Sequence, residues 1–296
     1  MDLVAPSANS IEKQFNQISS IEPLAVHGFK VVYKVKNAGI TEALKLIQIP
    51  VAGANDEQET ERNESLGRAK REVEALEKFN VPEIVKLGNL KPETVSLEGH
   101  DYLAYTEEFL TGKNLGDIIT INSGLPNEAE VRLLFLSMIK AVKEMWEKDF
   151  IHRDIKPKNV MKTDAPSRQF VLLDLGIAFS MHGESLTTNP KARPGTLLYM
   201  APEEFEDNYK DNIDYRCDLY SAALTVYEYA SSIHPLKKND GMARTISRII
   251  HVEPAPLKSH RNDLSDELCD LVDGMLKKKP ANRPGNMELL IRTLEK

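Results

Sequence analysis

The spacing of apolar residues changes at Pro126, and this change constrains the possible folds of the chain more than any other feature. Residues 29–36 alternate between apolar and mostly lysine side chains, which predicts a half-buried strand. A second strand is predicted from Glu42 to Ile49. Beyond Pro126 the apolar residues recur at helical spacing, after a capping box formed by Asn127 and Glu130. Strands followed by helices predict an α+β protein with a small β-rich part and a larger, mainly helical part.

Two further helices are predicted, and they differ in burial. From Arg68 to Phe79 apolar residues recur every three or four positions, so this helix is amphipathic, and Glu72 lies on or beside its apolar stripe. An acid turned toward packed side chains needs a positive partner, for which Lys45 is the candidate, whereas an acid at the edge of the stripe reaches water. The helix from Asp218 to Ala230 is apolar on nearly every face, which predicts a buried central element.

Composition and charge exclude several classes of protein. Hydrophobic residues at 41% and charged residues at 28% are typical of a soluble globular protein. The net charge of -7 argues against a nucleic-acid surface. No apolar run approaches membrane-spanning length, and residues 1–20 lack the pattern of a signal peptide. We therefore expect a cytoplasmic protein that binds neither nucleic acid nor membrane, in which Cys217 and Cys269 are buried thiols. The sequence indicates no oligomeric state.

Residues 152–159 read His-Arg-Asp-Ile-Lys-Pro-Lys-Asn and bring together the groups that phosphoryl transfer requires. Asp154 can accept or orient an incoming hydroxyl group, and Lys156 can place a positive charge near the migrating phosphoryl group. Asn159 offers a neutral oxygen to a metal ion. The sequence therefore predicts a catalytic loop.

A hairpin is predicted directly after this loop, with strands at residues 160–161 and 170–173. Asn159 precedes the first strand and Asp174 follows the second, so the open end of the hairpin should bring their side chains close together. One carboxylate and one amide suit Mg²⁺, which prefers a few hard oxygen ligands plus water and phosphates. We expect a site for Mg²⁺, with Mn²⁺ as an alternative, although an Asp and a Gly after a strand also occur in plain turns.

The loop at residues 152–159 resembles the catalytic loop of eukaryotic-type serine/threonine protein kinases, and the resemblance extends from about Ile21 to Leu290. Residues 174–176 are similar to the family's metal-binding Asp-Phe-Gly, with Leu for Phe. Ala201-Pro202-Glu203 is similar to the end of the activation segment, and Arg283 to the arginine that pairs with its glutamate. Asp218 resembles the aspartate that steadies the catalytic loop, although it could be only a helix cap. The resemblance implies a bilobal protein-kinase-like fold.

The resemblance also implies a site for ATP as the co-substrate. Lys45, held by Glu72, matches the lysine that contacts the α- and β-phosphates, and Asn159 and Asp174 match the metal ligands. The other implied ATP-binding residues surround the base or join the two lobes, and they are Leu24, Val32, Ala43, Glu108 and Met161. The residue at the back of this pocket is Thr106 or Glu107; we favour Thr106, because a glutamate there would be unusual.

The chain departs from the family in the glycine-rich loop. Ala25, His27 and Lys30 stand where the family has glycines, and only a displaced Gly28 is present. Glycine lets the backbone approach phosphates without a Cβ in the way, so this change argues for weakened nucleotide binding. Lys30 could offset part of the loss with its positive charge, or it could be an exposed strand lysine.

The resemblance divides the chain into an N-terminal extension at residues 1–20, an N-lobe at 21–109 with an acidic insert at 51–65, and a C-lobe at 110–296. Lys156 and Thr196 resemble positions found in serine/threonine rather than tyrosine kinases. The implied function is transfer of the γ-phosphate of Mg-ATP to serine or threonine hydroxyls of a protein substrate. Two alternatives are a pseudokinase that acts as a protein-binding scaffold or switch, and a small-molecule phosphotransferase.

Regulation and substrate preference give two further hypotheses. In this family, the arginine at the position of Arg153 often contacts a phosphate on the activation segment. Hydroxyls are available there for autophosphorylation at Ser185, Thr187 and Thr188. Lys158 sits where arginine-directed kinases often carry an acid, although Glu228 retains one acidic position. We therefore expect no strong preference for arginine before the acceptor.

Overall fold

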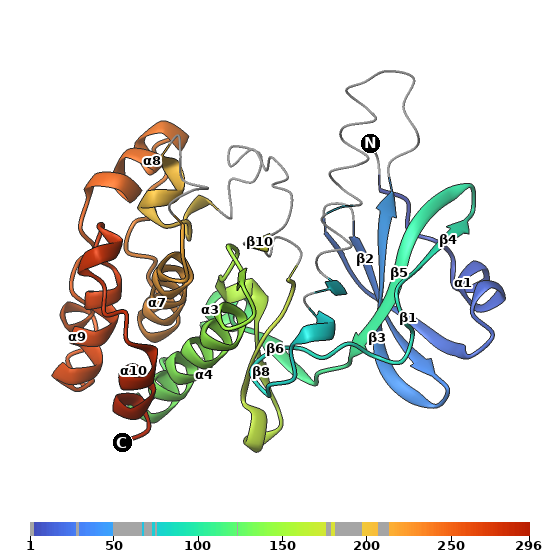
Figure 1. Ribbon diagram of the computed structural model, residues 1–296, viewed down its shortest axis with the longest axis horizontal. Coiled ribbons are helices and arrows are strands. Elements are labelled where there is room, and N and C mark those ends of the chain that lie inside the picture. The colour runs from blue at the N-terminus through green and yellow to red at the C-terminus, as the bar shows by residue number, and fades with distance from the viewer. Residues whose placement is uncertain are drawn as a thin grey trace. The chain divides into compact units, whose positions relative to one another are not determined.

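The computed structural model describes residues 3–27, 30–49, 67, 73–74, 76–122, 124–175, 179–180, 197–206 and 213–296. They belong to two compact units. The first contains Met1–Asn80 and Val85–Leu110, and the second contains Val81–Ile84 and most of the chain after Thr111. The first unit is built on a sheet and the second is mainly helical (Figure 1), so the predicted α+β fold class is confirmed.

The first unit contains a five-stranded antiparallel sheet with the strand order β1-β2-β3-β5-β4. Its strands are β1 (Ile18–His27), β2 (Lys30–Asn37), β3 (Ile40–Ile49), β4 (Glu93–Leu97) and β5 (His100–Glu108). The two strands predicted from the sequence are β2 and β3, and both are confirmed. Because side chains alternate between the faces of a sheet, neighbouring residues of these strands lie on opposite faces.

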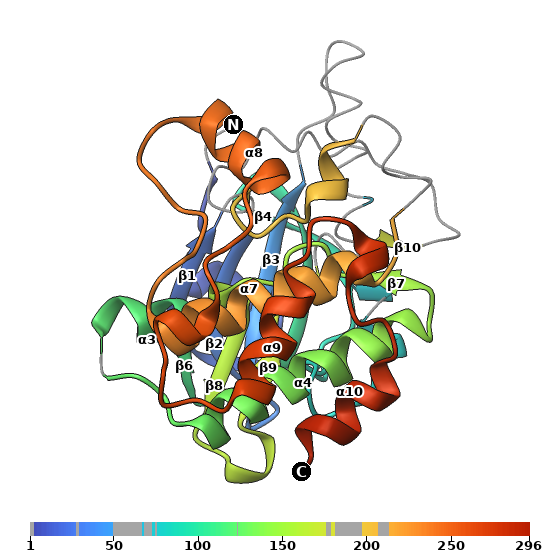
Figure 2. The ribbon, with the colours of Figure 1, turned by 90° about the vertical axis from the view of Figure 1, so that its left-hand side faces the viewer.

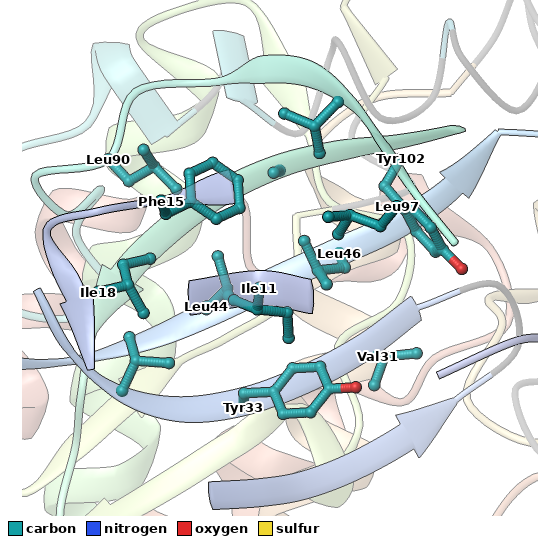
Figure 3. Packing of buried hydrophobic residues seen from close by; sticks show 13 residues of the cluster. Ile11, Phe15, Ile18, Val31, Tyr33, Leu44, Leu46, Leu90, Leu97 and Tyr102 are labelled. Atoms are coloured by element: carbon teal, nitrogen blue, oxygen red, sulfur yellow. The ribbon is translucent and has the colours of Figure 1, made fainter. Parts of the chain in front are cut away.

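One face of this sheet carries the hydrophobic core of the unit, and helix α1 (Ala8–Gln14) lies on it. Ile11 and Phe15 from the helix region pack with Tyr33 and Leu44 of the sheet (Figure 3). Backbone carbonyls ahead of the helix are also tied to the sheet, since the Tyr33 hydroxyl donates to the Pro6 oxygen at 2.6 Å. Residues between Leu3 and Ile18 therefore contribute to the core of the β-rich unit.

The second unit is organised around helices α4 (Glu128–Trp146) and α7 (Arg216–Ser231), which pack together. The side chain of Asn127 accepts the Glu130 N–H at 2.9 Å, as predicted for an N-cap, whereas the Glu130 carboxylate accepts from Lys162 and Tyr229 instead of completing a capping box. Nearly every residue of α7 is buried, which confirms the predicted central helix (Figure 2).

The described part of the second unit also contains shorter elements. Its other α-helices there are α3 (Leu115–Ile121), α8 (Met242–His251), α9 (Asp266–Met275) and α10 (Met287–Leu294). Its 3₁₀ helices are η1 (Pro157–Asn159), η2 (Pro166–Arg168), η4 (Pro202–Phe205), η5 (Leu257–Ser259) and η6 (Pro280–Asn282). Its strands are β6 (Gly112–Asn114), β7 (Phe150–Ile151), β8 (Val160–Thr163), β9 (Phe170–Leu172) and β10 (Phe179–Ser180). Among the described residues, no helix is both long and apolar enough to cross a membrane.

Candidate active site

Asp218 fixes the backbone of the predicted catalytic loop from the first turn of α7. Its carboxylate accepts the N–H groups of His152 and Arg153 at 2.7 and 2.8 Å. Arg153 has a φ of +65°, in the left-handed region that non-glycine residues seldom adopt, so these two bonds stabilise an unfavourable conformation. Burial raises the pKa of Asp218 above its ordinary value, although these N–H groups and the neighbouring His152 oppose the shift. Asp218 is therefore more than a helix cap.

The side chains of the loop converge on the carboxylate of Asp154. Lys156 Nζ lies 2.8 and 2.7 Å from its two oxygens, and Asn159 Nδ2 donates to Oδ2 at 2.9 Å. Asn159 Nδ2 also donates to the Asp154 backbone oxygen, again at 2.9 Å. The Asp154 side chain is only 3% exposed, so these charge-assisted bonds hold it in one orientation. The amide oxygen is then the atom that Asn159 can offer a metal ion.

Strands β8 and β9 form the predicted hairpin and place Asn159 and Asp174 at its open end. Val160 pairs with Leu172, and the Leu173 N–H donates to the Asn159 backbone oxygen at 2.7 Å. Asp174 is the next residue and has a φ of +57°, which sets the direction of the chain as it leaves the hairpin. One amide oxygen and one carboxylate at this end fit the hard-oxygen ligands that Mg²⁺ prefers.

The second face of the five-stranded sheet carries the predicted nucleotide-binding side chains. Cross-strand pairing runs from Ala25 to Val32, on to Lys45 and then to Tyr105, so these residues form a row on one face. Ala43 lies two residues from Lys45 and therefore shares this face. Lys30 lies on the same face of β2 as Val32. Three residues predicted to bind ATP are thus brought onto one surface of the sheet.

Glu107 is a charged neighbour of Lys45 on this face. Lys45 Nζ lies 2.5 Å from Glu107 Oε1, and the two side chains are 8% and 5% exposed. Thr106 is paired with Leu44 of the hydrophobic core, and its hydroxyl oxygen accepts the Leu90 N–H at 2.9 Å. The preference for Thr106 over Glu107 was therefore wrong, because the register of β3 and β5 turns Thr106 away from Lys45. Only that register distinguishes the two residues.

Comparison with known proteins agrees with this geometry. Residues 28–293 match the sequence-family model described as the protein kinase domain. This chain belongs to the protein kinase domain family. The resemblance found in the sequence is thereby confirmed.

Several curated proteins are similar to this kinase domain. A probable serine/threonine-protein kinase of Clostridium perfringens is 26% identical over 284 residues, covering 95% of this chain and 38% of that protein. Serine/threonine-protein kinase 1 of Arabidopsis thaliana is 25% identical, covering 96% and 31%. A probable serine/threonine-protein kinase PknB of Bifidobacterium longum is 30% identical over 195 residues, covering 64% and 27%. The chain spans only 27–38% of the length of these relatives.

The ion pair predicted between Arg283 and Glu203 is present in the second unit. Arg283 donates from both terminal nitrogens to the two oxygens of Glu203, at 2.6 and 2.7 Å. Glu203 belongs to η4, and Arg283 directly follows η6. Because the arginine side chain is fully buried, the pair joins two distant segments of the second unit where water does not compete.

Glu204 is a buried carboxyl group that the sequence did not single out. It lies 3.5 Å from Nε of Arg153, and its side chain is 2% exposed. Burial raises the pKa of Glu204 to about 7, against the opposing influence of Arg153. Arg153 thus already faces a carboxyl group of the kinase domain itself, which the resemblance alone did not indicate.

The remaining predicted residues fall into two groups. Glu108 accepts the Lys86 N–H at 2.7 Å, Met161 lies half-buried in β8, and Leu24 is 44% exposed on β1. The others lie outside the described residues, and they are Glu72, Ser185, Thr187, Thr188 and Thr196. Half of the predicted helix at 68–79 and the displaced Gly28 also lie outside them, whereas residues 73–74 and 76–78 of that helix are described and helical.

Proposed function

We propose that this kinase domain transfers the γ-phosphate of ATP to serine or threonine hydroxyls of protein substrates. The observation that supports this most is the environment of Asp154, whose buried carboxylate is held by Lys156 and Asn159. A general base has to be oriented before the hydroxyl arrives, and these bonds supply that orientation. The proposed lobes are residues 21–109 and 110–296, with the extension at 1–20.

Each predicted charged side chain has a separate task in this proposal. Asp154 accepts the proton of the attacking hydroxyl, and Lys156 places its ammonium group beside the phosphoryl group being transferred. Lys45 binds the α- and β-phosphates of ATP. The Asn159 oxygen and the Asp174 carboxylate would hold Mg²⁺, which neutralises phosphate charge when bound.

The test is transfer of radiolabelled γ-phosphate from ATP with Mg²⁺ to the protein itself and to a generic basic protein. We expect Asp154→Asn to lower the rate by about 100-fold or more, the range in which general-base catalysis contributes. Asp174→Asn should also lower the rate, because it removes the carboxylate that would hold Mg²⁺. Asp164→Asn is a matched control, because Asp164 is an exposed aspartate in the turn of the same hairpin. Label that persists in both active-site variants would contradict the proposal.

Two further experiments test regulation and substrate preference. Mapping the labelled protein tests autophosphorylation at Ser185, Thr187 or Thr188, and an absence of label between residues 179 and 193 would remove that hypothesis. A peptide array should show no strong selection for arginine before the acceptor, because the exposed Lys158 repels a basic side chain. The carboxylate of Glu228, the one acidic position retained, accepts a hydrogen bond from the Tyr199 hydroxyl.

A second candidate function is a pseudokinase that binds protein partners. The observation that favours it is the sequence of β1 and β2, where Ala25, His27 and Lys30 stand in the place of glycines. Absence of transferred label, together with no calorimetric binding of ATP at millimolar concentration, would favour this function over catalysis.

A further inference from the structure

A buried lysine and a buried glutamate meet on the second face of the five-stranded sheet. Lys45 Nζ lies 2.5 Å from Glu107 Oε1, and it also lies over the ring of Tyr105, 5.8 Å from the centroid. A buried ammonium group needs compensating charge around it, and a carboxylate in contact and an aromatic ring both contribute to that compensation. Glu107 and Tyr105 therefore help to define where the ammonium group of Lys45 sits.

The backbone of the sheet fixes this pair. Glu107 is directly opposite Ala43 in the ladder between β3 and β5, and Ala43 lies two residues before Lys45. Lys45 and Glu107 are thus diagonal neighbours on one face, within reach of long side chains. The pairing of β3 with β5 therefore brings the two side chains together.

We propose that Glu107 is a positioning residue for Lys45, and that its carboxylate holds the ammonium group where the diphosphate portion of a nucleotide binds. This inference rests on the proposed function, because it assumes that Lys45 contacts phosphate. A carboxylate repels phosphate, so Glu107 acts through Lys45 rather than on the nucleotide itself. Loss of the Glu107 charge should consequently weaken binding of phosphate-bearing ligands and spare the nucleoside.

The test compares the affinity of the full chain for ADP with Mg²⁺ and for adenosine, by calorimetry and by competition. We expect Glu107→Gln to weaken ADP binding by about 10-fold or more, the scale of one charge-assisted hydrogen bond, and to leave adenosine binding within about 2-fold. Glu107→Asp keeps the carboxylate on a shorter side chain and should recover part of the ADP affinity. A purely structural defect would weaken both ligands alike.

A control variant and the results that would contradict the inference complete the experiment. Glu22→Gln removes the carboxylate of an exposed lysine–glutamate pair of the same sheet, formed with Lys34, and should leave both affinities unchanged. Equal loss of ADP and adenosine in Glu107→Gln, or no loss of ADP, would overturn the inference. If Glu107→Gln does not fold, the same selectivity for ADP is required of Glu107→Asp.

Failure of the inference is distinguishable from failure of the proposed function. Wild-type protein that binds ADP and transfers phosphate, with no effect of Glu107→Gln, overturns the role of Glu107 alone. Wild-type protein that binds no ADP and transfers no phosphate overturns both.

Discussion

Replacement of Arg283 by methionine should destabilise the second unit severely. The guanidinium group makes five hydrogen bonds, two to the carboxylate of Glu203 and one each to the backbone oxygens of Lys277, Lys278 and Arg216. Methionine retains much of the apolar volume but has no donor for these acceptors. The variant Arg283→Met therefore leaves a buried carboxylate and three carbonyl oxygens without these partners.

The expected loss follows from burial. Removing one partner of a buried ion pair costs about 3–5 kcal/mol, because the remaining charge is left desolvated. The pair of Lys140 and Glu295, with side chains 34% and 48% exposed, provides the matched comparison in the same unit. An exposed pair contributes about 0–1 kcal/mol, so Lys140→Met should change the free energy of unfolding by no more than that.

Urea unfolding monitored by tryptophan fluorescence measures both variants. Trp146 is the only tryptophan of the chain and lies at the end of α4 in the second unit, 5.1 Å from the ring of Tyr215, so its emission reports that unit. The double variant of Arg283→Met with Glu203→Met should be more stable than Arg283→Met alone, since it removes the unpaired carboxylate. A loss for Arg283→Met below about 1 kcal/mol, equal to that of Lys140→Met, would refute this reasoning.

Three other predictions test the loop, a strand glycine and a buried histidine. Asp218→Asn should lower both the rate of phosphate transfer and the free energy of unfolding, the latter by about 1.5–3 kcal/mol. The reason is that an amide nitrogen then faces a backbone N–H such as that of Arg153. An unchanged rate of transfer would contradict this prediction. Gly112 has a φ of +139° and a Cβ there would overlap the backbone oxygen of Lys162, so Gly112→Ala should lower the urea midpoint, and an unchanged midpoint would show that the strand relaxes. Burial lowers the pKa of His234 from 6.5 to about 4, so the unfolded chain binds a proton more tightly than the folded chain does. The free energy of unfolding should therefore fall by up to about 3 kcal/mol as the pH drops from 6.5 to about 4. His234→Asn, which retains an acceptor for the backbone, should show a shallower fall in unfolding free energy, and equal slopes would contradict the assignment.

Features whose parts lie close together in the chain could be predicted from the amino-acid sequence. Asp154, Lys156 and Asn159 belong to one short loop, so their convergence follows from local geometry. The hairpin after this loop was equally predictable, because two short apolar runs with turn residues between them have few ways to pair. The burial of α7 followed from its composition alone.

Contacts between side chains that are distant in the chain depend on the packed fold. Lys45 and Glu107 are 62 residues apart in the chain, and which of two adjacent residues of β5 faces Lys45 depends on the strand register. Likewise, the approach of Glu204 to Arg153 depends on the folding of η4 against the catalytic loop. A shift of one residue in a strand exchanges its two faces, so local spacing cannot choose between Thr106 and Glu107, whereas the packed sheet allows only one choice.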